Sequence, residues 1–258
     1  MAVHRILLLL FSVSVATINA HPCAHIKGGT IAPEAAYRYQ VSIRSNGTHI
    51  CSGSIIDQRH ILTSRYCVGS ILVKDLSIIA GTNSLKEGGV IYTAKKIILH
   101  ENLSQDIALI RTTEDINFDS RIEPIAITDK DYRDDGTPIL ITGWGNLLDG
   151  TLLTELLQEV HIRLFDQDQC VKRYGDIGES KFCTIEKCGT HLCQIDIGSP
   201  LVVHNVLIGI KSLGYNCGLD RADIHVRIYH FIDWIEINTK IEPDPTTTTS
   251  APVTEECF

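Results

Sequence analysis

The chain has 258 residues, 44% of them hydrophobic, which is enough for a sizeable core in one compact unit or in two small barrels sharing an interface. Its 23 basic and 31 acidic residues give a net charge of -8 at pH 7. This acidic balance argues against a nucleic-acid partner, because binding a phosphate backbone requires clustered Lys and Arg side chains.

The first residues have the pattern of an export signal. Residues 1–5 carry a positive side chain, an apolar run extends from Ile6 to Ala16, and the small residue Ala20 stands at a plausible cleavage site. The apolar run is too short for a membrane-spanning helix, which needs ~20 residues. The sequence therefore predicts a signal peptide over residues 1–20, a short propeptide-like segment over 21–25, and a secreted, extracellular protein without membrane attachment.

The body of the chain has the pattern of short β-strands. Apolar and polar residues alternate from Tyr39 to Arg44, as in a half-buried strand. Further short apolar runs span residues 71–73, 76–80, 97–99, 107–110 and 139–142. Polar or Gly-rich stretches separate these runs, which predicts an all-β sandwich or barrel. Residues 201–203 and 206–210, separated by His204 and Asn205, predict a hairpin.

The end of the chain predicts a helix followed by a disordered tail. Ile228, Phe231, Ile232 and Ile235 recur at helical spacing, so one apolar face should pack on the body of the protein. Prolines then end the helix, and the Thr/Pro-rich residues 241–258 cannot bury enough surface to fold. Further upstream, the polar stretch 128–138 is the best candidate for a join between two halves.

Nine cysteines in an exported chain predict disulfides rather than reduced thiols. Cys188, His191 and Cys193 could be mistaken for part of a zinc site. A tetrahedral zinc site needs four ligands, and no second Cys/His pair stands nearby at the spacing of a zinc finger. We therefore expect no metal and no cofactor.

Two sequons are present, Asn46-Gly47-Thr48 and Asn102-Leu103-Ser104. In a secreted chain, Asn46 and Asn102 are candidate N-glycosylation sites. Such triplets also occur by chance, so the prediction concerns the sites and not their occupancy.

A series of spaced motifs covers about residues 26 to 240. In chain order they are Ile26–Gly29, Cys51–Ile56, Ile61–Cys67, Asp106–Ile110, Gly143–Gly145, Cys193–Leu201, Ser212–Gly214 and Phe231–Ile235. Together they resemble the trypsin/chymotrypsin family of serine proteases. The resemblance implies one trypsin-like domain over residues 26–240, made of two six-stranded antiparallel β-barrels joined near 128–138, with a C-terminal α-helix.

The resemblance also implies that the catalytic residues are altered. In this family an aspartate orients a histidine, the histidine takes the proton of the serine, and two backbone amides stabilise the oxyanion. Asp106 stands at the aspartate position, but Tyr66 replaces the histidine and Ile197 the serine. Ile195 replaces the glycine whose amide usually faces the oxyanion. A neutral phenol is a poor base and an isoleucine has no nucleophile, so the resemblance predicts an inactive homologue.

Two alternatives remain, one for the role of Ser199 and one for the partner of Asp106. Ser199 could be an unconventional nucleophile, but it falls at a family glycine, and moving an attacking oxygen by ~1 Å can cost ~10²-fold in rate. The preferred interpretation is a small polar loop residue. Without its histidine, Asp106 could instead be held by the hydroxyl of Tyr66 or by Ser212.

The specificity pocket is altered too. His191 matches the base of the pocket, where trypsins carry aspartate, and Asp223 matches a glycine of the pocket wall. These two side chains could form a pair sensitive to pH, or could simply fill an unused cavity. Leu213 replaces a tryptophan that lines the substrate cleft, next to the pocket residue Gly214.

A further departure concerns activation. Asp196 matches the aspartate that pairs with the new amino group of Ile26 after cleavage. The His25-Ile26 bond lacks the Lys or Arg that trypsin-like activators require. We therefore hypothesise that this bond is not cleaved and that the surrounding loops stay zymogen-like.

The resemblance implies three disulfides, Cys51 to Cys67, Cys170 to Cys183 and Cys193 to Cys217, each stabilising by ~2–4 kcal/mol. Cys23, Cys188 and Cys257 remain. An odd number leaves at least one cysteine free or available for an intermolecular bridge. Cys257, in the predicted tail, is the strongest candidate for that bridge.

These features predict a secreted, non-catalytic protein that binds an extracellular partner such as a protease, an inhibitor or a host protein, as a decoy or regulator. One alternative is a trypsin-like endopeptidase with unconventional residual activity. The other is a structural extracellular glycoprotein, bridged through its odd cysteine.

Overall fold

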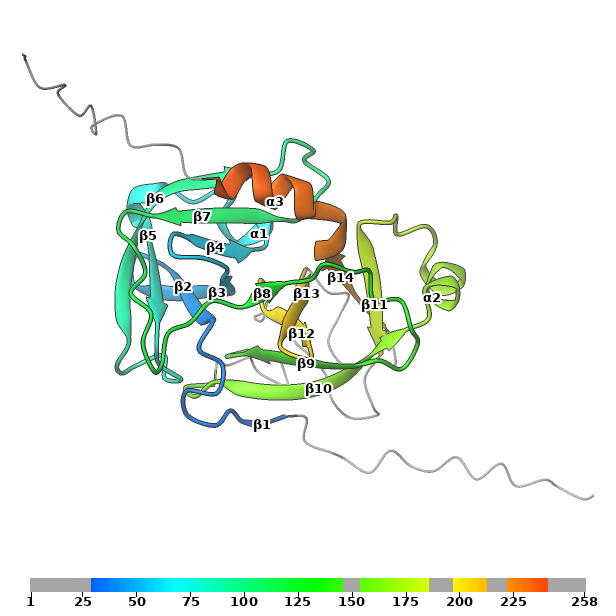
Figure 1. Cartoon of the computed structure of the whole chain (residues 1–258), viewed down its shortest axis with the longest axis horizontal. Helices are drawn as coiled ribbons and strands as arrows, with labels where there is room; N and C mark the ends of the chain where they lie inside the picture. The colour runs from blue at the N-terminus through cyan, green and yellow to red at the C-terminus, as the bar shows by residue number, and fades with distance from the viewer. Residues whose placement is uncertain (1–28, 146–153, 186–196, 213–221, 241–258) are drawn as a thin grey trace, which may run out of the picture.

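The computed structural model describes residues 29–145, 154–185, 197–212 and 222–240. Its strands form two six-stranded antiparallel β-barrels that lie side by side, with a C-terminal helix packed over them (Figure 1). The predicted fold is therefore confirmed. Among the described residues, no helix has the length and apolar character needed to cross a membrane.

The first barrel is closed in the strand order β2-β3-β4-β7-β6-β5. Its strands are β2 (Gln40–Ser45), β3 (Thr48–Ile55), β4 (His60–Thr63), β5 (Leu76–Ala80), β6 (Val90–Leu99) and β7 (Ala108–Thr112). The 3-10 helix η1 (Val73–Asp75) precedes β5. β-Branched side chains fill the interior because they pack well on a pleated surface. Fully buried examples are Val41, Ile43, Ile55, Ile61, Ile78 and Ile110.

Strand β2 differs from the prediction of a half-buried strand. Gln40 and Ser42, on its supposedly exposed face, are buried as well. The Gln40 side-chain oxygen accepts a hydrogen bond of 2.7 Å from the hydroxyl of Thr142 in the second barrel. The half-buried expectation was wrong because the neighbouring barrel covers the outer face of this strand.

The second barrel consists of β9 (Pro138–Gly143), β10 (Gln158–Phe165), β11 (Lys181–Ile185), β12 (Pro200–Val203), β13 (Val206–Lys211) and β14 (Asp223–Arg227). The pairing of β10 with β9 closes the ring. β1 (Thr30–Ile31) is added to β10, and β8 (Ala126–Ile127) pairs in parallel with β13. The helix α2 (Gln167–Tyr174) begins after Asp166, whose side chain accepts from the Gln169 N–H.

The predicted hairpin is present between β12 and β13. Its turn residues His204 and Asn205 both have positive φ, 48° and 62°. Two positive φ angles define the type I′ turn, whose twist matches that of paired strands. The sequence signal for this turn was therefore correct.

The chain passes between the barrels slightly earlier than predicted. The Ile125 N–H donates to Ile55 O of the first barrel at 2.9 Å, whereas Ala126 already pairs with Val206 of the second. Residues 128–137 then lie on the second barrel, where the Thr128 N–H donates to Leu207 O at 3.1 Å. The apolar residue Ile125, packed between the barrels, marks the crossing rather than the polar stretch 128–138.

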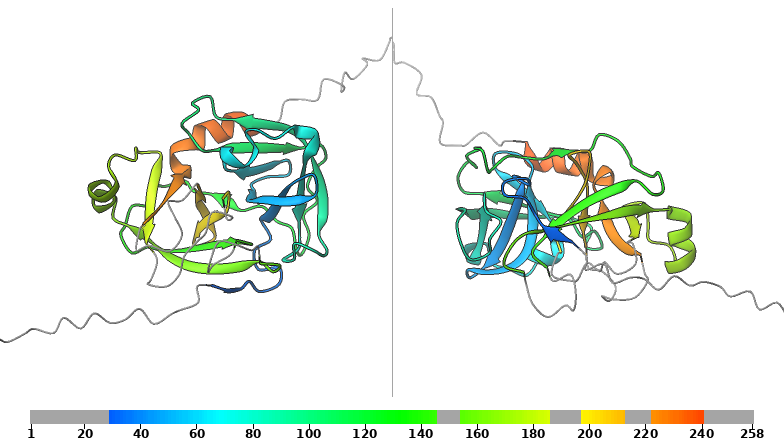
Figure 2. Two further views of the ribbon diagram at one scale, coloured as in Figure 1. Left: turned by 180° about the vertical axis from the view of Figure 1, so that it is seen from behind. Right: turned by 90° about the horizontal axis from the view of Figure 1, so that it is seen from below.

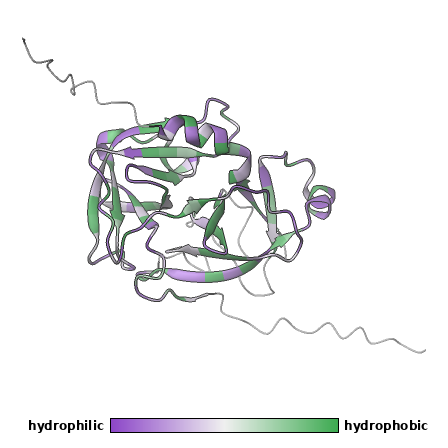
Figure 3. Cartoon of the chain, viewed as in Figure 1, coloured by the Kyte–Doolittle hydropathy of each residue, from purple (hydrophilic) through white to green (hydrophobic). Residues whose placement is uncertain are grey.

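The predicted C-terminal helix is present but begins as a 3-10 turn. Ile228 and Phe231 belong to η3 (Ile228–Phe231), and α3 (Ile232–Thr239) follows. Trp234 and Ile235 of α3 pack with them against residues of both barrels, so the helix covers the seam between the barrels (Figure 2). Asp233 and Glu236 are exposed on its outer side, where Figure 3 shows hydrophilic colouring.

Candidate functional site

Asp106 lies just before β7 and connects the two barrels through hydrogen bonds. Its Oδ1 accepts from the Ser64 hydroxyl at 2.6 Å and from the Tyr66 backbone N–H at 2.9 Å. Its Oδ2 accepts from the hydroxyl of Ser212, directly after β13, at 2.5 Å. The prediction that Ser212 holds Asp106 is confirmed. Tyr66 contributes its backbone N–H rather than the predicted hydroxyl, because its ring points toward solvent.

Sequence analysis missed Ser64, although its signal was present. Ser64 caps the short helix α1 (Arg65–Val68), and its side chain accepts from the Tyr66 N–H at 3.1 Å. Serine is a preferred N-cap residue because its oxygen satisfies a free N–H of the first turn. Asp106 therefore fixes the start of α1, and the Tyr66 side chain above it is 63% exposed.

Ile197 is a core residue in this structure. Its side chain is 5% exposed and packs in the hydrophobic core of the first barrel, with Cys51 and Cys67 among the members of that cluster. Its carbonyl accepts from the Ser52 N–H at 3.0 Å. An aliphatic side chain buried in this way presents no reactive atom to a ligand.

Gly198 holds the segment close to the first barrel. Its φ is +83°, and a Cβ atom there would lie 2.1 Å from the carbonyl oxygen of Ser52. Only glycine allows this conformation and this close approach together.

Ser199 is fully buried, with 0% exposure. Its carbonyl accepts from the Lys211 N–H at 2.9 Å, as in a strand pairing. Its hydroxyl is buried and makes no hydrogen bond within the described part of the chain. A substrate cannot reach this oxygen in the conformation that the structure describes.

Asp223 starts β14 and lies near a buried lysine that sequence analysis did not single out. The Lys211 Nζ atom is 3.8 Å from Asp223 Oδ2, and Lys211 is fully buried. His225, opposite Lys211 in the strand register, is also buried and bonds Thr184 Oγ1 through Nε2 at 2.8 Å. Burial lowers the pKa of His225 well below its usual value, and the charge of Lys211 lowers it further.

Comparison with known proteins identifies the relatives of this chain. Residues 26–235 match the model of the Trypsin family. The chain belongs to the trypsin family. Among its relatives, chymotrypsin-2 of Vespa crabro is 33% identical over 218 residues, which cover 83% of this chain and 99% of that protein.

Two further trypsin-family relatives show similar likeness over most of their length. Serine protease 1 of Rattus norvegicus is 34% identical over 220 residues, covering 82% of this chain and 88% of that protein. Trypsin epsilon of Drosophila erecta is 32% identical over 224 residues, covering 82% of this chain and 86% of that protein.

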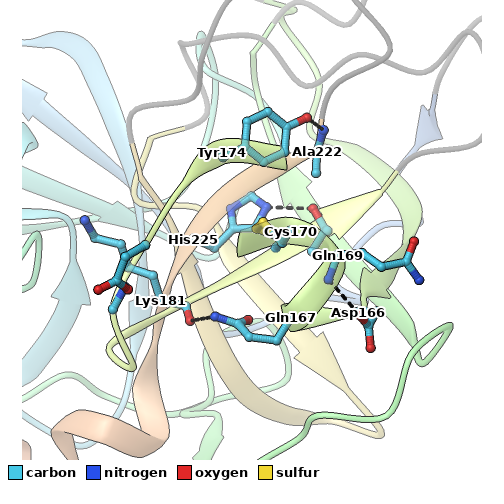
Figure 4. Close-up of a disulfide and its surroundings, with 12 residues drawn as sticks. Asp166, Gln167, Gln169, Cys170, Tyr174, Lys181, Ala222 and His225 are labelled. Atoms are coloured by element: carbon cyan, nitrogen blue, oxygen red, sulfur yellow. Dashed lines mark hydrogen bonds between the residues drawn. A yellow bond between two sulfur atoms is a disulfide. The ribbon is translucent and has the colours of Figure 1, made fainter. Parts of the chain in front are cut away.

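Two of the disulfides implied by the trypsin-family resemblance are present. Cys51 of β3 is joined to Cys67 of α1, which anchors the helix that carries Tyr66. Cys170 of α2 is joined to Cys183 of β11. Around the second disulfide, Figure 4 shows the backbone N–H of Ala222 donating to the Tyr174 hydroxyl, at 2.8 Å.

The remaining predicted sites concern glycosylation, metal binding and residues that the structure does not describe. Asn46, at the β2–β3 turn, and Asn102, in the loop before Asp106, are both exposed. Within the described ranges, no group of three or more His, Cys, Asp or Glu side chains is arranged to hold a metal ion. The predicted sites outside the described residues are Cys23, Ile26, Cys188, His191, Cys193, Ile195, Asp196, Leu213, Gly214, Cys217 and Cys257.

Proposed function

We propose that this trypsin-family chain does not cleave peptides and acts as a secreted protein that binds an extracellular partner. The burial of Ile197 at the nucleophile position carries this proposal. Loss of a single serine or histidine from a comparable protease triad costs about 10⁶-fold in turnover. Ile197 supplies no group that could replace the serine.

The arrangement around Asp106 supports the same proposal. General base catalysis requires a proton acceptor within hydrogen-bond reach of the nucleophile, oriented by a third group. Here Asp106 accepts from two hydroxyls and a backbone N–H, so it holds the scaffold together across the barrels. The Tyr66 ring is turned to solvent instead of being held by the carboxylate.

The alternative of residual endopeptidase activity through Ser199 has no support in the geometry. A nucleophile must approach the reacting carbonyl at about 3–3.5 Å. Ser199 is fully buried and its backbone is paired with Lys211, so reaching a substrate would require the strand to open. We therefore prefer a binding role over an enzymatic one.

A binding role must come from the surface, because a fold does not determine a function. Two large apolar side chains are exposed on the elements that hold Asp106. Tyr66 on α1 is 63% exposed and Leu103, in the loop before Asp106, is 75% exposed. Arg65 of α1 bonds His100 O of that loop at 2.9 Å, so the two elements are connected. Exposed aromatic side chains are frequent contributors to protein interfaces.

The catalytic part of the proposal is tested with a fluorophosphonate probe that labels active serine nucleophiles. The mature chain should remain unlabelled and should not hydrolyse a panel of peptide substrates. An active trypsin-family relative treated in parallel serves as the positive control. Labelling of the native chain that disappears in Ser199→Ala would contradict the proposal.

The binding part is tested by crosslinking the native chain in the fluid into which it is secreted, followed by affinity purification and mass spectrometry. A specific partner should be recovered with the native chain and reduced several-fold with Tyr66→Ala. Ile237→Ala, which changes an exposed apolar residue on α3, is the matched control and should retain the partner. Recovery of no specific protein would contradict a binding role. Detection of Ile26 as the first residue would overturn the hypothesis that the His25-Ile26 bond stays intact.

A further inference from the structure

A pair of opposite charges is enclosed in the second barrel, next to the candidate site. Lys211 is the last residue of β13 and Asp223 the first residue of β14. Their side chains are 1% and 16% exposed, and Lys211 Nζ lies 3.8 Å from Asp223 Oδ2. A buried ammonium group is costly unless an anion or other acceptors compensate it, so this contact matters to the fold.

The strand register places both side chains on the inner face of the barrel. Lys211 lies opposite His225, and His225 lies opposite Phe182, a member of the second barrel's core. Directly opposed residues share one face of a sheet, as do residues two apart on a strand. Asp223 is two residues from His225, so Lys211 and Asp223 share the face that carries Phe182.

The backbone of Lys211 is fixed on the side of the candidate site. Its N–H donates to Ser199 O at 2.9 Å, and its carbonyl accepts from the Gly198 N–H at 2.8 Å. The next residue, Ser212, donates to Asp106. The Lys211 side chain therefore starts from a rigid position beside Asp106 and extends into the barrel toward Asp223.

We infer that Asp223 forms a binding site for a primary alkylammonium group and that Lys211 occupies this site from within the chain. The Lys211 stem fills the space, and its ammonium group neutralises the carboxylate. A basic side chain from another protein therefore finds the position taken. This inference rests on the proposed function. It adds a second reason, independent of Ile197, why the chain does not take up a substrate.

The site is tested by removing its internal occupant and supplying an external one. Lys211→Ala deletes the atoms beyond Cβ, and n-propylammonium has the same carbon chain and charge. The melting temperature of Lys211→Ala should rise with n-propylammonium, and the same rise should need about tenfold more 1-propanol, because only the amine forms a charge-assisted contact with Asp223. Equal effects of the amine and the alcohol would overturn the inference.

Two further variants separate the site from a general effect of the amine. Lys211→Met keeps an unbranched stem in place, so its melting temperature should not respond to n-propylammonium. Lys211→Ala combined with Asp223→Asn retains the cavity but loses the carboxylate, so the preference for the amine over the alcohol should disappear. A response of Lys211→Met, or a preference that persists in the double variant, would overturn the inference.

The comparison also works if Lys211→Ala does not fold by itself. The soluble fraction recovered on refolding is then measured with n-propylammonium and with 1-propanol. Greater recovery with the amine, lost in the double variant, is the expected result, and equal recovery or none would overturn the inference. These assays measure neither peptide cleavage nor partner binding, so their failure is distinguishable from failure of the proposed function.

Discussion

The two barrels tolerate buried charge differently. Among the described residues, the buried side chains able to carry positive charge are His60 in the first barrel and Lys211, His225 and Arg227 in the second. The first barrel has also taken Ile197 into its apolar core. Ile197 thus adds apolar packing to the first barrel. In the second barrel, Lys211 and Asp223 form a pair of opposite charges.

The two halves of the candidate site are therefore held by different forces. The first half depends on apolar packing and on the close approach of Gly198 to Ser52. The second half depends on pairing of ions that would be costly to leave alone inside the protein. Substitutions in the two halves should therefore destabilise the protein for different physical reasons.

The largest effect is expected for Gly198→Ala, at the contact between the first barrel and the Ile197 segment. The new Cβ would lie 2.1 Å from Ser52 O and 2.5 Å from Thr63 Oγ1, in a backbone with φ of +83°. We expect little or no folded protein in soluble expression and circular dichroism. Gly178→Ala, with φ of +75° and nothing within 4 Å, is the matched control and should cost only about 1 kcal/mol. Similar losses in both variants would show that strain, not the close approach, matters.

The next effect concerns the ion pairs of the second barrel. Arg227 is 4% exposed and donates to Asp131 at 2.6 Å, so Asp131→Ala leaves a buried guanidinium without its anion. The free energy of unfolding should fall by about 3–5 kcal/mol in denaturant titrations. Asp115→Ala breaks the pair with the partly exposed Arg59 of the first barrel and should cost less than about 1 kcal/mol. Equal costs would remove the distinction between the barrels.

A smaller effect is expected for Ile197→Ser, which replaces an apolar core residue of the first barrel with a hydroxyl-bearing one. The variant loses a buried aliphatic side chain, so the free energy of unfolding should fall by about 3 kcal/mol. Ile197→Val should cost about 1 kcal/mol because it removes only one methyl group. Under the proposed function, we expect Ile197→Ser to remain unlabelled by a fluorophosphonate. An unchanged stability would show that Ile197 contributes no packing.

Sequence patterns predicted the parts of the fold that depend on local chemistry. Alternation identified β2, the His204-Asn205 turn identified the β12–β13 hairpin, and apolar spacing identified the C-terminal helix. The resemblance added the two barrels and the Cys51–Cys67 and Cys170–Cys183 disulfides. These features follow from turn conformations, from helical periodicity and from an ordered series of motifs.

Features that depend on strand register could not be predicted in this way. Lys211 follows the apolar run 206–210 and has the pattern of the polar residue that ends a strand. Only the pairing with His225 places its side chain inside the barrel. Gln40 and Ser42 are similar, because only the position of the second barrel buries them. Ser64 differs, since its position before a short helix was a readable capping signal.

The smallest effect concerns pH and the contact between the barrels at His49. Its Nδ1 lies 2.8 Å from Ser42 Oγ, and its ring packs edge-on against Trp144 of the second barrel. Partial burial, assisted by the charge of Arg44, lowers the pKa of His49 to about 4. Unfolding raises this pKa to its usual value near 6.5, so the unfolded chain binds the proton more tightly and stability falls as the pH drops from about 6.5 to 4.

His49→Gln should reduce that loss by about 2 kcal/mol in denaturant titrations at pH 7 and 4.5, whereas His161→Gln, at an exposed histidine, should leave the profile unchanged. Parallel pH profiles of the native chain and His49→Gln would show that His49 is not the group whose protonation loosens the contact between the barrels.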